Sequence, residues 1–268
     1  MPVDMAALAA DLAAESAVTL ALVAGLDEAA WHTPTPAAGW DIADQIGHLA
    51  YFDEAAVRSA VHPDEFRAEV AAAAAEGNLD ADIIAARYRD RTGAQLLAWF
   101  EGARAGLVET FTKLDPRQRL PWFGPAMSAA SSLTARIMET WAHTQDIADA
   151  LGVTREPTSR LRHVAHIGVG ALPYSYAVRG QTPPDTQIRV ELTAPDGTRW
   201  TWGPDDATNR VTGTALDFCL LVTQRRHRDD LALTTAGPAA QEWMAIAQAF
   251  AGPPGPGRPP IGPEIQPA

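Results

Sequence analysis

The chain has 268 residues and a formal charge of −12, and its 47% hydrophobic and 20% charged residues exclude a chain that is disordered throughout. At about 150 residues per domain, this length fits one large domain or two modest ones. No uninterrupted run of about 18 apolar residues occurs, and residues 1–4 contain no basic segment, so we expect neither a transmembrane helix nor a secretory signal. These features predict a cytoplasmic protein.

The acidic excess lies in the first part of the chain. Residues 1–150 contain 22 acidic and 10 basic side chains, whereas residues 151–268 contain 11 of each. Because no basic stripe is present, we expect neither nucleic acid nor an anionic membrane as a partner. Cys219 is the only cysteine, which excludes an intrachain disulfide and a zinc site made of cysteines. We expect a small-molecule substrate, and the composition fits a monomer and a homodimer equally.

Four helices are predicted in residues 1–155, where apolar residues recur at helical spacing. Asp4 and Asp41 supply N-caps for the first two helices, and Pro116 ends the third. The predicted helices run from Asp4 to Gly25, from Asp41 past Val57, from about Asp80 to Leu114 and from Ser128 to Gly152. Four helices with one long connection form a bundle, and such bundles build ligand and metal sites between facing helices.

The sequence pattern changes after residue 155. Residues 159–179 predict a helix that bends at Pro173. The elements predicted next are two strands around residues 188–192 and 200–202 with a turn at 195–197, a helix capped by Thr214, a strand over 231–235 and a helix from Pro238. Residues 156–251 are therefore predicted to form a connecting helix and a small α+β domain. Residues 252–268 contain seven prolines and four glycines and predict a disordered tail.

Glu139 and His143 are the first candidate metal ligands, because a spacing of four residues places both side chains on one helix face, one turn apart. His48, in the middle of the second predicted helix, is the best third candidate. Two imidazoles and one carboxylate leave coordination positions open, as in catalytic sites, and suit zinc or non-haem iron. Asp146 is expected to orient a ligand or a neighbouring side chain. The spacing alone favours a simpler interpretation, a solvated Glu-His pair and a hydrogen-bonded core histidine.

Two segments resemble a known family. Residues 40–49, Trp-Asp-Ile-Ala-Asp-Gln-Ile-Gly-His-Leu, resemble the first metal motif of the mycothiol-dependent maleylpyruvate isomerase family, and residues 139–146 resemble its second. The resemblance covers about residues 5–250. It implies an α+β protein, in which a DinB-like four-helix bundle (1–155) precedes a small α/β sterol-carrier-like domain. It also implies that His48, Glu139 and His143 bind a divalent metal, with zinc favoured.

Residues 218–225 resemble the C-terminal helix of that family, where an arginine faces the active-site cleft. Arg225 is therefore the candidate catalytic residue, because a guanidinium binds a substrate carboxylate through two hydrogen bonds. The residues just before Arg225 depart from the family pattern, so Arg226 is an alternative. A basic helix end that complements the helix dipole explains the pattern equally well. The overall similarity is to an uncharacterised branch of the family.

The resemblance implies an enzyme that uses a metal and a low-molecular-weight thiol, mycothiol in that family. Such an enzyme would be an isomerase or an S-transferase acting on a small organic acid or electrophile. One alternative is a metal-hydroxide hydrolase, lyase or isomerase that uses no thiol. Another is a non-catalytic metal-binding protein of the same fold. Activity measured with and without thiol and metal distinguishes these three hypotheses.

Overall fold

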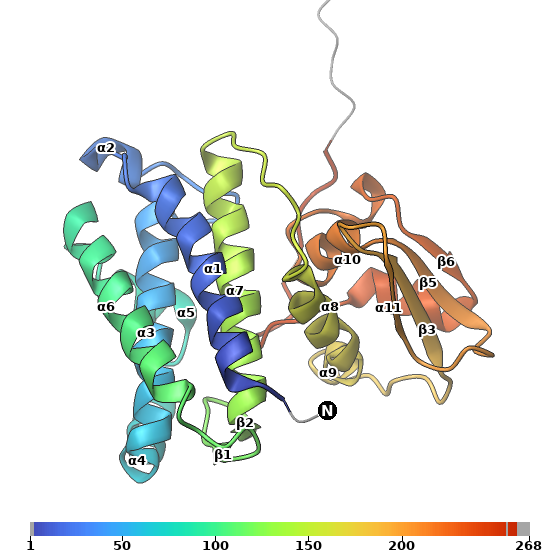
Figure 1. The fold of residues 1–268 in the computed structure, drawn as a ribbon, viewed down its shortest axis with the longest axis horizontal. Helices are drawn as coiled ribbons and strands as arrows, with labels where there is room; N and C mark the ends of the chain where they lie inside the picture. Colours follow the sequence, from blue (N-terminus) through green and yellow to red (C-terminus); the bar gives the residue numbers. More distant parts are fainter. Residues whose placement is uncertain (1–2, 256, 262–268) are drawn as a thin grey trace, which may run out of the picture. The chain divides into compact units, whose positions relative to one another are not determined.

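A computed structural model describes residues 3–255 and 257–261 of the chain. The chain divides into two compact units, residues 1–155 and residues 156–268. Unit 1 is helical apart from one short hairpin, and unit 2 combines helices with a sheet (Figure 1). The expected fold class, a helical part followed by a small α/β part, is therefore confirmed.

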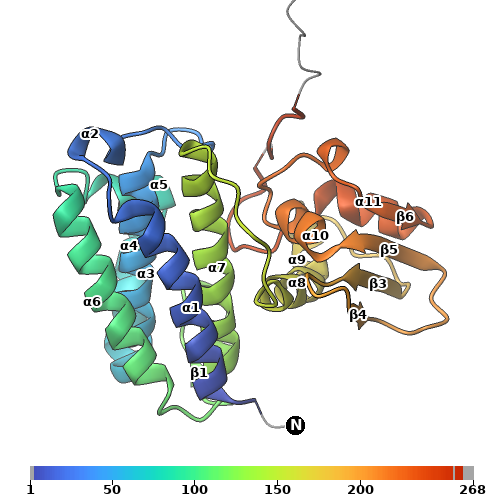
Figure 2. The same ribbon diagram turned by 45° about the horizontal axis from the view of Figure 1, so that its top comes forward.

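The long helices of unit 1 lie side by side as a four-helix bundle (Figures 1 and 2). They are α1 (Met5–Val23), α3 (Ile42–Val61), α6 (Gly93–Phe111) and α7 (Ala129–Ala150). The connections contain α2 (Glu28–Trp31), α4 (Pro63–Ala75), α5 (Ala81–Ala86) and an antiparallel hairpin of β1 (Arg119–Leu120) and β2 (Met127–Ser128). The predicted bundle is thus present within the described residues.

Side-chain caps begin α1 and α3 at the residues that the sequence predicts, and α7 begins near Ser128, as predicted. Asp4 accepts hydrogen bonds from two backbone N–H groups in the first turn of α1. Asp41 and Asp44 form a reciprocal capping box at the start of α3, and Ser128 caps α7. These caps satisfy backbone donors that would otherwise lack a partner, and they fix the register of the helices that carry the candidate ligands.

The prediction of one helix over residues 80–114 is wrong. The chain turns after α5, and α6 begins at Gly93, where Thr92 and Gln95 form a second capping box. Gly93 packs closely on another part of the bundle, since a Cβ at this position would lie 2.2 Å from Trp31 Nε1. The close packing of Gly93 on Trp31 is a tertiary contact, and the helical periodicity of the sequence does not predict it.

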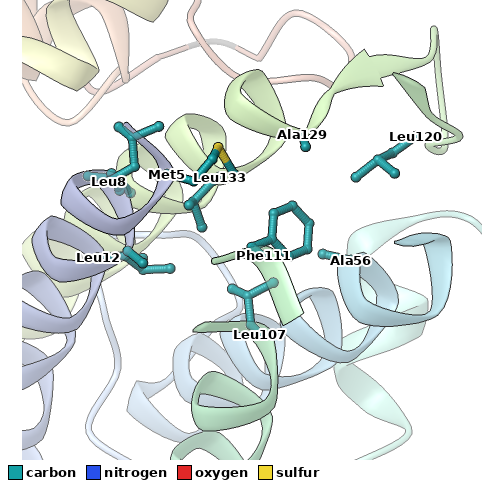
Figure 3. Packing of buried hydrophobic residues seen from close by; sticks show 11 residues of the cluster. Met5, Leu8, Leu12, Ala56, Leu107, Phe111, Leu120, Ala129 and Leu133 are labelled. Carbon is teal, nitrogen blue, oxygen red and sulfur yellow. The ribbon is translucent and has the colours of Figure 1, made fainter. Parts of the chain in front are cut away.

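The bundle interior contains two apolar clusters, and Figure 3 shows the packing of the first. The first apolar cluster consists of Met5, Leu8, Ala9, Leu12, Ala56, Leu107, Phe111, Leu120, Ala129, Leu133 and Ile137. The second apolar cluster consists of Val23, Trp31, Ile42, Ala43, Ile46, Leu49, Ala50, Leu96, Phe100, Ala103 and Ile147. Burial of these side chains supplies most of the driving force for folding of the bundle.

A set of buried polar residues separates the two apolar clusters along each long helix. Arg104 of α6 donates from Nε to Asp53 Oδ2 of α3 (2.7 Å) and from Nη1 to Ser16 Oγ of α1 (2.5 Å). Its Nη2 donates to Thr140 Oγ1 of α7 (2.9 Å). Arg136 donates from Nε to the other carboxylate oxygen of Asp53 (3.1 Å). We call these five residues the polar layer, and through it one guanidinium joins all four helices.

One bundle helix could cross a membrane by length and composition alone. α1 has 19 residues and a mean hydropathy of 1.6 over its most apolar window. It also contains Asp11 and Glu15, and Glu15 is buried in the bundle, where it pairs with Arg155. α1 contributes residues to the first apolar cluster, as the core helix of a folded bundle does.

Unit 2 is built on a sheet with the strand order β4-β3-β5-β6. Its strands are β3 (Ile188–Thr193), β4 (Arg199–Trp202), β5 (Asn209–Thr214) and β6 (Thr234–Ala236). The predicted hairpin of β3 and β4 is confirmed, and Gly197 in its turn has a φ of 82°. β5 pairs in parallel with β3 and was not predicted. β6 lies slightly later in the chain than the predicted strand over 231–235.

The helices of unit 2 are α8 (Leu161–Gly170), α9 (Leu172–Ala177), α10 (Ala215–Val222), the short 3-10 helix η1 (Arg228–Asp230) and α11 (Pro238–Ile246). The predicted single helix over 159–179 is wrong, because the chain turns at Ala171 and a separate helix, α9, follows with Pro173 in its first turn. Thr214 caps α10 and α11 begins at Pro238, as predicted. Of the predicted disordered tail, residues 256 and 262–268 lie outside the described residues.

Candidate metal centre

The candidate ligands come together from two adjacent bundle helices. His48 lies on α3, and Glu139 and His143 lie one turn apart on α7. One ligand atom of each residue lies within 4.8 Å of the others. Glu139 Oε2 is 3.2 Å from His143 Nε2 and 3.7 Å from His48 Nε2. The structure therefore places the three residues predicted from sequence in one cluster that converges on a single point.

The protonation states of the cluster suit metal ligation. Burial, together with a smaller effect of the neighbouring His143, lowers the pKa of His48 to about 3. Burial alone would raise the pKa of Glu139, but the nearby imidazoles of His143 and His48 and the charge of Arg136 hold that pKa well below its usual range. His48 is therefore a neutral imidazole and Glu139 an anion at neutral pH, which are the forms that bind a divalent cation.

Aromatic rings flank the two imidazoles. Trp40 stacks on His143 with ring centroids 6.0 Å apart, and the ring centroids of Trp40 and Phe52 lie 5.3 Å and 4.5 Å from that of His48. Trp40 is fixed by a hydrogen bond from its Nε1 to Asp82 Oδ1 (2.6 Å). These rings exclude water from part of the cluster, which strengthens electrostatic interactions there.

Two further side chains support the cluster, and the sequence analysis missed both. Gln45 Oε1 accepts a hydrogen bond from His143 Nδ1. Arg136 belongs to the polar layer and adds positive charge near Glu139 and His48. Each of the two precedes a candidate ligand on its own helix by three residues and thus shares a helix face with it. That spacing is a signal the sequence contained.

The remaining predicted site residues lie outside this cluster. Asp146 is fully buried on α7 but is not part of the converging set. Arg225 lies in unit 2 just after α10, where its Nη1 donates to Thr223 O (2.7 Å). Arg226 follows it and donates to the backbone oxygen of Arg225 (2.7 Å). The assignment of Arg225 or Arg226 to a substrate carboxylate stays a prediction.

Comparison with known proteins yields two family matches and close relatives. Residues 12–148 match the mycothiol maleylpyruvate isomerase N-terminal domain, and residues 184–236 match a family described as wyosine base formation. An uncharacterised protein from Mycobacterium tuberculosis strain H37Rv, and its counterpart in strain CDC 1551, are 48% identical over 255 residues, which is 95% of this chain and 99% of each relative.

Two solved structures share the fold. They are the crystal structures of the mycothiol-dependent maleylpyruvate isomerase and of a histidine-to-alanine mutant of it, with TM-scores of 0.58 and 0.57. Both are 16% identical to this chain, and each alignment covers 87% of this chain and 93% of the other. The domain match and the full-length relatives show that this chain belongs to the family with the mycothiol maleylpyruvate isomerase N-terminal domain.

Proposed function

We propose that this protein is a metal-dependent enzyme whose centre is formed by His48, Glu139 and His143. The observation that carries the proposal is the convergence of three ligand atoms within 4.8 Å of one another on facing helices. Two neutral imidazoles and one carboxylate are a common donor set for zinc, and non-haem iron accepts the same set. Three protein ligands leave coordination positions open for a substrate, which distinguishes a catalytic centre from a structural one.

The proposed chemistry is thiol-dependent isomerisation or S-transfer on a small organic acid or electrophile. When bound, a divalent ion lowers the pKa of a thiol or water molecule that binds to it, which supplies a nucleophile at neutral pH. The solved structures with this fold are named as a mycothiol-dependent isomerase, so mycothiol is the proposed thiol. Cys219 does not serve this purpose, because it is fully buried and burial raises the pKa of its thiol well above the usual value.

The protein's own residues bind and orient the reactants. His48, Glu139 and His143 hold the ion, and the ring faces of Trp40 and Phe52 keep bulk water from one part of the centre. We assign Arg225 to the binding of a substrate carboxylate, since its planar guanidinium donates two parallel hydrogen bonds.

Metal analysis of the purified protein tests the proposal. We expect about one zinc or iron ion per chain in the parent and almost none in a His143→Ala variant, because two remaining ligands hold a divalent ion weakly. His166→Ala is the matched control, since His166 is exposed on α8 of unit 2 and lies outside the cluster. A parent protein that contains no metal and takes up no added zinc contradicts the proposal.

Turnover measurements then separate the thiol-dependent reaction from its alternative. The metal-loaded parent is assayed on activated double bonds and on electrophiles, with and without mycothiol. Loss of turnover when the thiol is omitted supports the isomerase or S-transferase assignment. Full turnover with metal alone selects the metal-hydroxide chemistry instead.

A further inference from the structure

Gln45 contacts the metal centre, although it is not one of the three candidate ligands. It lies on α3 three residues before His48 and is fully buried. Its Oε1 accepts a hydrogen bond from His143 Nδ1 across the α3–α7 interface. A buried amide is costly unless both of its ends are satisfied, so the groups at its other end decide its orientation.

The other end of the amide faces Thr35, in the loop before α3. Gln45 Nε2 donates to Thr35 Oγ1 (2.9 Å), and Thr35 Oγ1 in turn donates to the backbone oxygen of Trp40 (2.9 Å). The single hydroxyl proton of Thr35 is thereby used, so its oxygen is an acceptor toward Gln45. Gln45 must then point Nε2 at Thr35 and Oε1 at His143.

This orientation fixes which nitrogen of His143 carries a proton. Oε1 is only an acceptor, so His143 Nδ1 must be the donor, and in the neutral imidazole, the form that binds a metal, Nε2 then presents its lone pair to the cluster. Nε2 lies 3.2 Å from Glu139 Oε2, which is also an acceptor. The lone pairs of these two acceptor atoms repel each other unless a cation lies between them, and a metal ion bound by both residues is such a cation.

His48 lacks an equivalent support. Its Nδ1 is buried and has no hydrogen-bond partner among the residues that the structure describes. The two histidines of the cluster therefore differ in their support. Only His143 has a side-chain hydrogen bond to its outer nitrogen, Nδ1, which is the ring nitrogen not directed at the other ligands. A hydrogen bond on that outer nitrogen orients a ligand ring and increases its basicity.

We propose that Gln45 is a positioning residue that holds His143 with its proton on Nδ1 and so aims Nε2 at the metal. The inference rests on the proposed metal centre, but it concerns the protonated nitrogen of one ring and is measurable without metal.

The direct test is nitrogen NMR of the His143 ring in metal-free protein at about pH 8, assigned by comparison with His143→Ala. In the parent we expect a protonated Nδ1. In Gln45→Met, which keeps the side-chain length but lacks an acceptor, we expect the proton on Nε2, because Glu139 is then the acceptor within reach. Gln45→Glu keeps an acceptor oxygen and is expected to retain the proton on Nδ1.

The second readout is zinc affinity, measured by competition with a chromophoric chelator. We expect Gln45→Met to bind zinc about 10–100-fold more weakly than the parent, as for other partners of metal-bound histidines. Gln145→Met is the matched control, since Gln145 is also buried and lies on α7, but its amide bonds Asp149 (2.8 Å) rather than the cluster. Its zinc affinity is expected to equal that of the parent.

Three results would overturn the inference. A parent ring that carries its proton on Nε2 shows that the amide has the opposite orientation. A Gln45→Met protein in which His143 keeps its proton on Nδ1, and which binds zinc as tightly as Gln145→Met, shows that Gln45 does not position His143. A parent that shows the expected tautomer but binds no zinc removes the metal centre itself and leaves Gln45 with a structural hydrogen bond only. Circular dichroism confirms that each variant is folded.

Discussion

The apolar clusters and the polar layer of the bundle use the same four helices in different ways. The clusters fill the interior with aliphatic and aromatic side chains that need only shape and volume to match. The polar layer instead requires specific partners, because a buried guanidinium without acceptors is strongly destabilising. Arg104 meets this requirement with one acceptor from each of the other three helices.

α7 shows what this difference contributes to function. Leu133 and Ile137 lie in the first apolar cluster and Ile147 in the second, while the stretch between them carries the half-buried Glu139 and the buried His143. The two apolar clusters stabilise the bundle on either side of a polar stretch that is itself costly to bury. We infer that the clusters provide the stability that allows a metal-binding set of side chains to exist inside a helical bundle.

Replacing the central guanidinium should have the largest effect on stability. Arg104→Met leaves the carboxylate of Asp53 and two hydroxyls with fewer partners, and we expect the free energy of unfolding to fall by about 3–5 kcal/mol. Urea denaturation measures this change. Arg67→Met, which removes an exposed arginine of α4, should leave stability nearly unchanged. An Arg104→Met protein as stable as Arg67→Met would show that the polar layer is not required for the fold.

A truncation in an apolar cluster gives the matched comparison on the same helix. Leu107 follows Arg104 by three residues on α6 and is fully buried in the first apolar cluster. Leu107→Ala should lower the free energy of unfolding by about 3 kcal/mol, from lost burial and the cavity that remains. Because this cluster holds no candidate ligand, zinc content per folded chain should stay at the parent value. A loss of zinc in this folded variant would contradict the separation of the two regions.

Acidification tests the buried histidine beside the polar layer. The pKa of His48 is about 3 in the folded protein and about 6.5 in the unfolded chain, so the unfolded state binds more protons between these values. The stability of the folded state does not depend on the protonation of His48 above about pH 6.5. Below that pH, protonation of His48 in the unfolded chain lowers the free energy of unfolding progressively until the pH reaches about 3. Metal-free parent should lose about 2 kcal/mol more than His48→Gln between about pH 7 and pH 5. Equal losses in the two proteins would show that His48 is not held neutral.

The sequence allowed prediction of those features that depend on local spacing. The caps at Asp4 and Asp41 and the start of α7 near Ser128 follow from residue type and position, and the pair Glu139 and His143 follows from the period of the helix. His48 was the best third candidate from its position in a predicted helix, and the family resemblance then placed it in one site with the pair, because it is 91 residues from Glu139 and no local pattern joins them. The two motifs together nevertheless identified all members of the cluster that the structure contains.

Features that depend on distant partners were not predictable in this way. Asp53 and Arg104 are 51 residues apart, and each reads as an ordinary charged residue of an amphipathic helix. α4 is largely exposed and rich in alanine, so it offers no apolar stripe to identify it. β5 contains Asn209, Gly213 and two threonines, a weak strand pattern, and it is held by parallel pairing with β3. These elements are defined by tertiary contacts rather than by local preference.

The smallest effect is expected where a polar contact lies at the surface of the bundle rather than inside it. Asp41 forms the capping box of α3, and Asp41→Ala should lower the free energy of unfolding by about 1 kcal/mol. The loss is modest because water replaces the acceptor at a partly exposed helix end, whereas the carboxylate and the hydroxyls that accept from Arg104 belong to buried residues. Zinc content should not change, since His48 lies about two turns further along α3. Asp64→Ala, at an exposed position of α4, controls for the lost charge. If Asp41→Ala lowered the free energy of unfolding as much as Arg104→Met, burial would not explain the large contribution of the polar layer to stability.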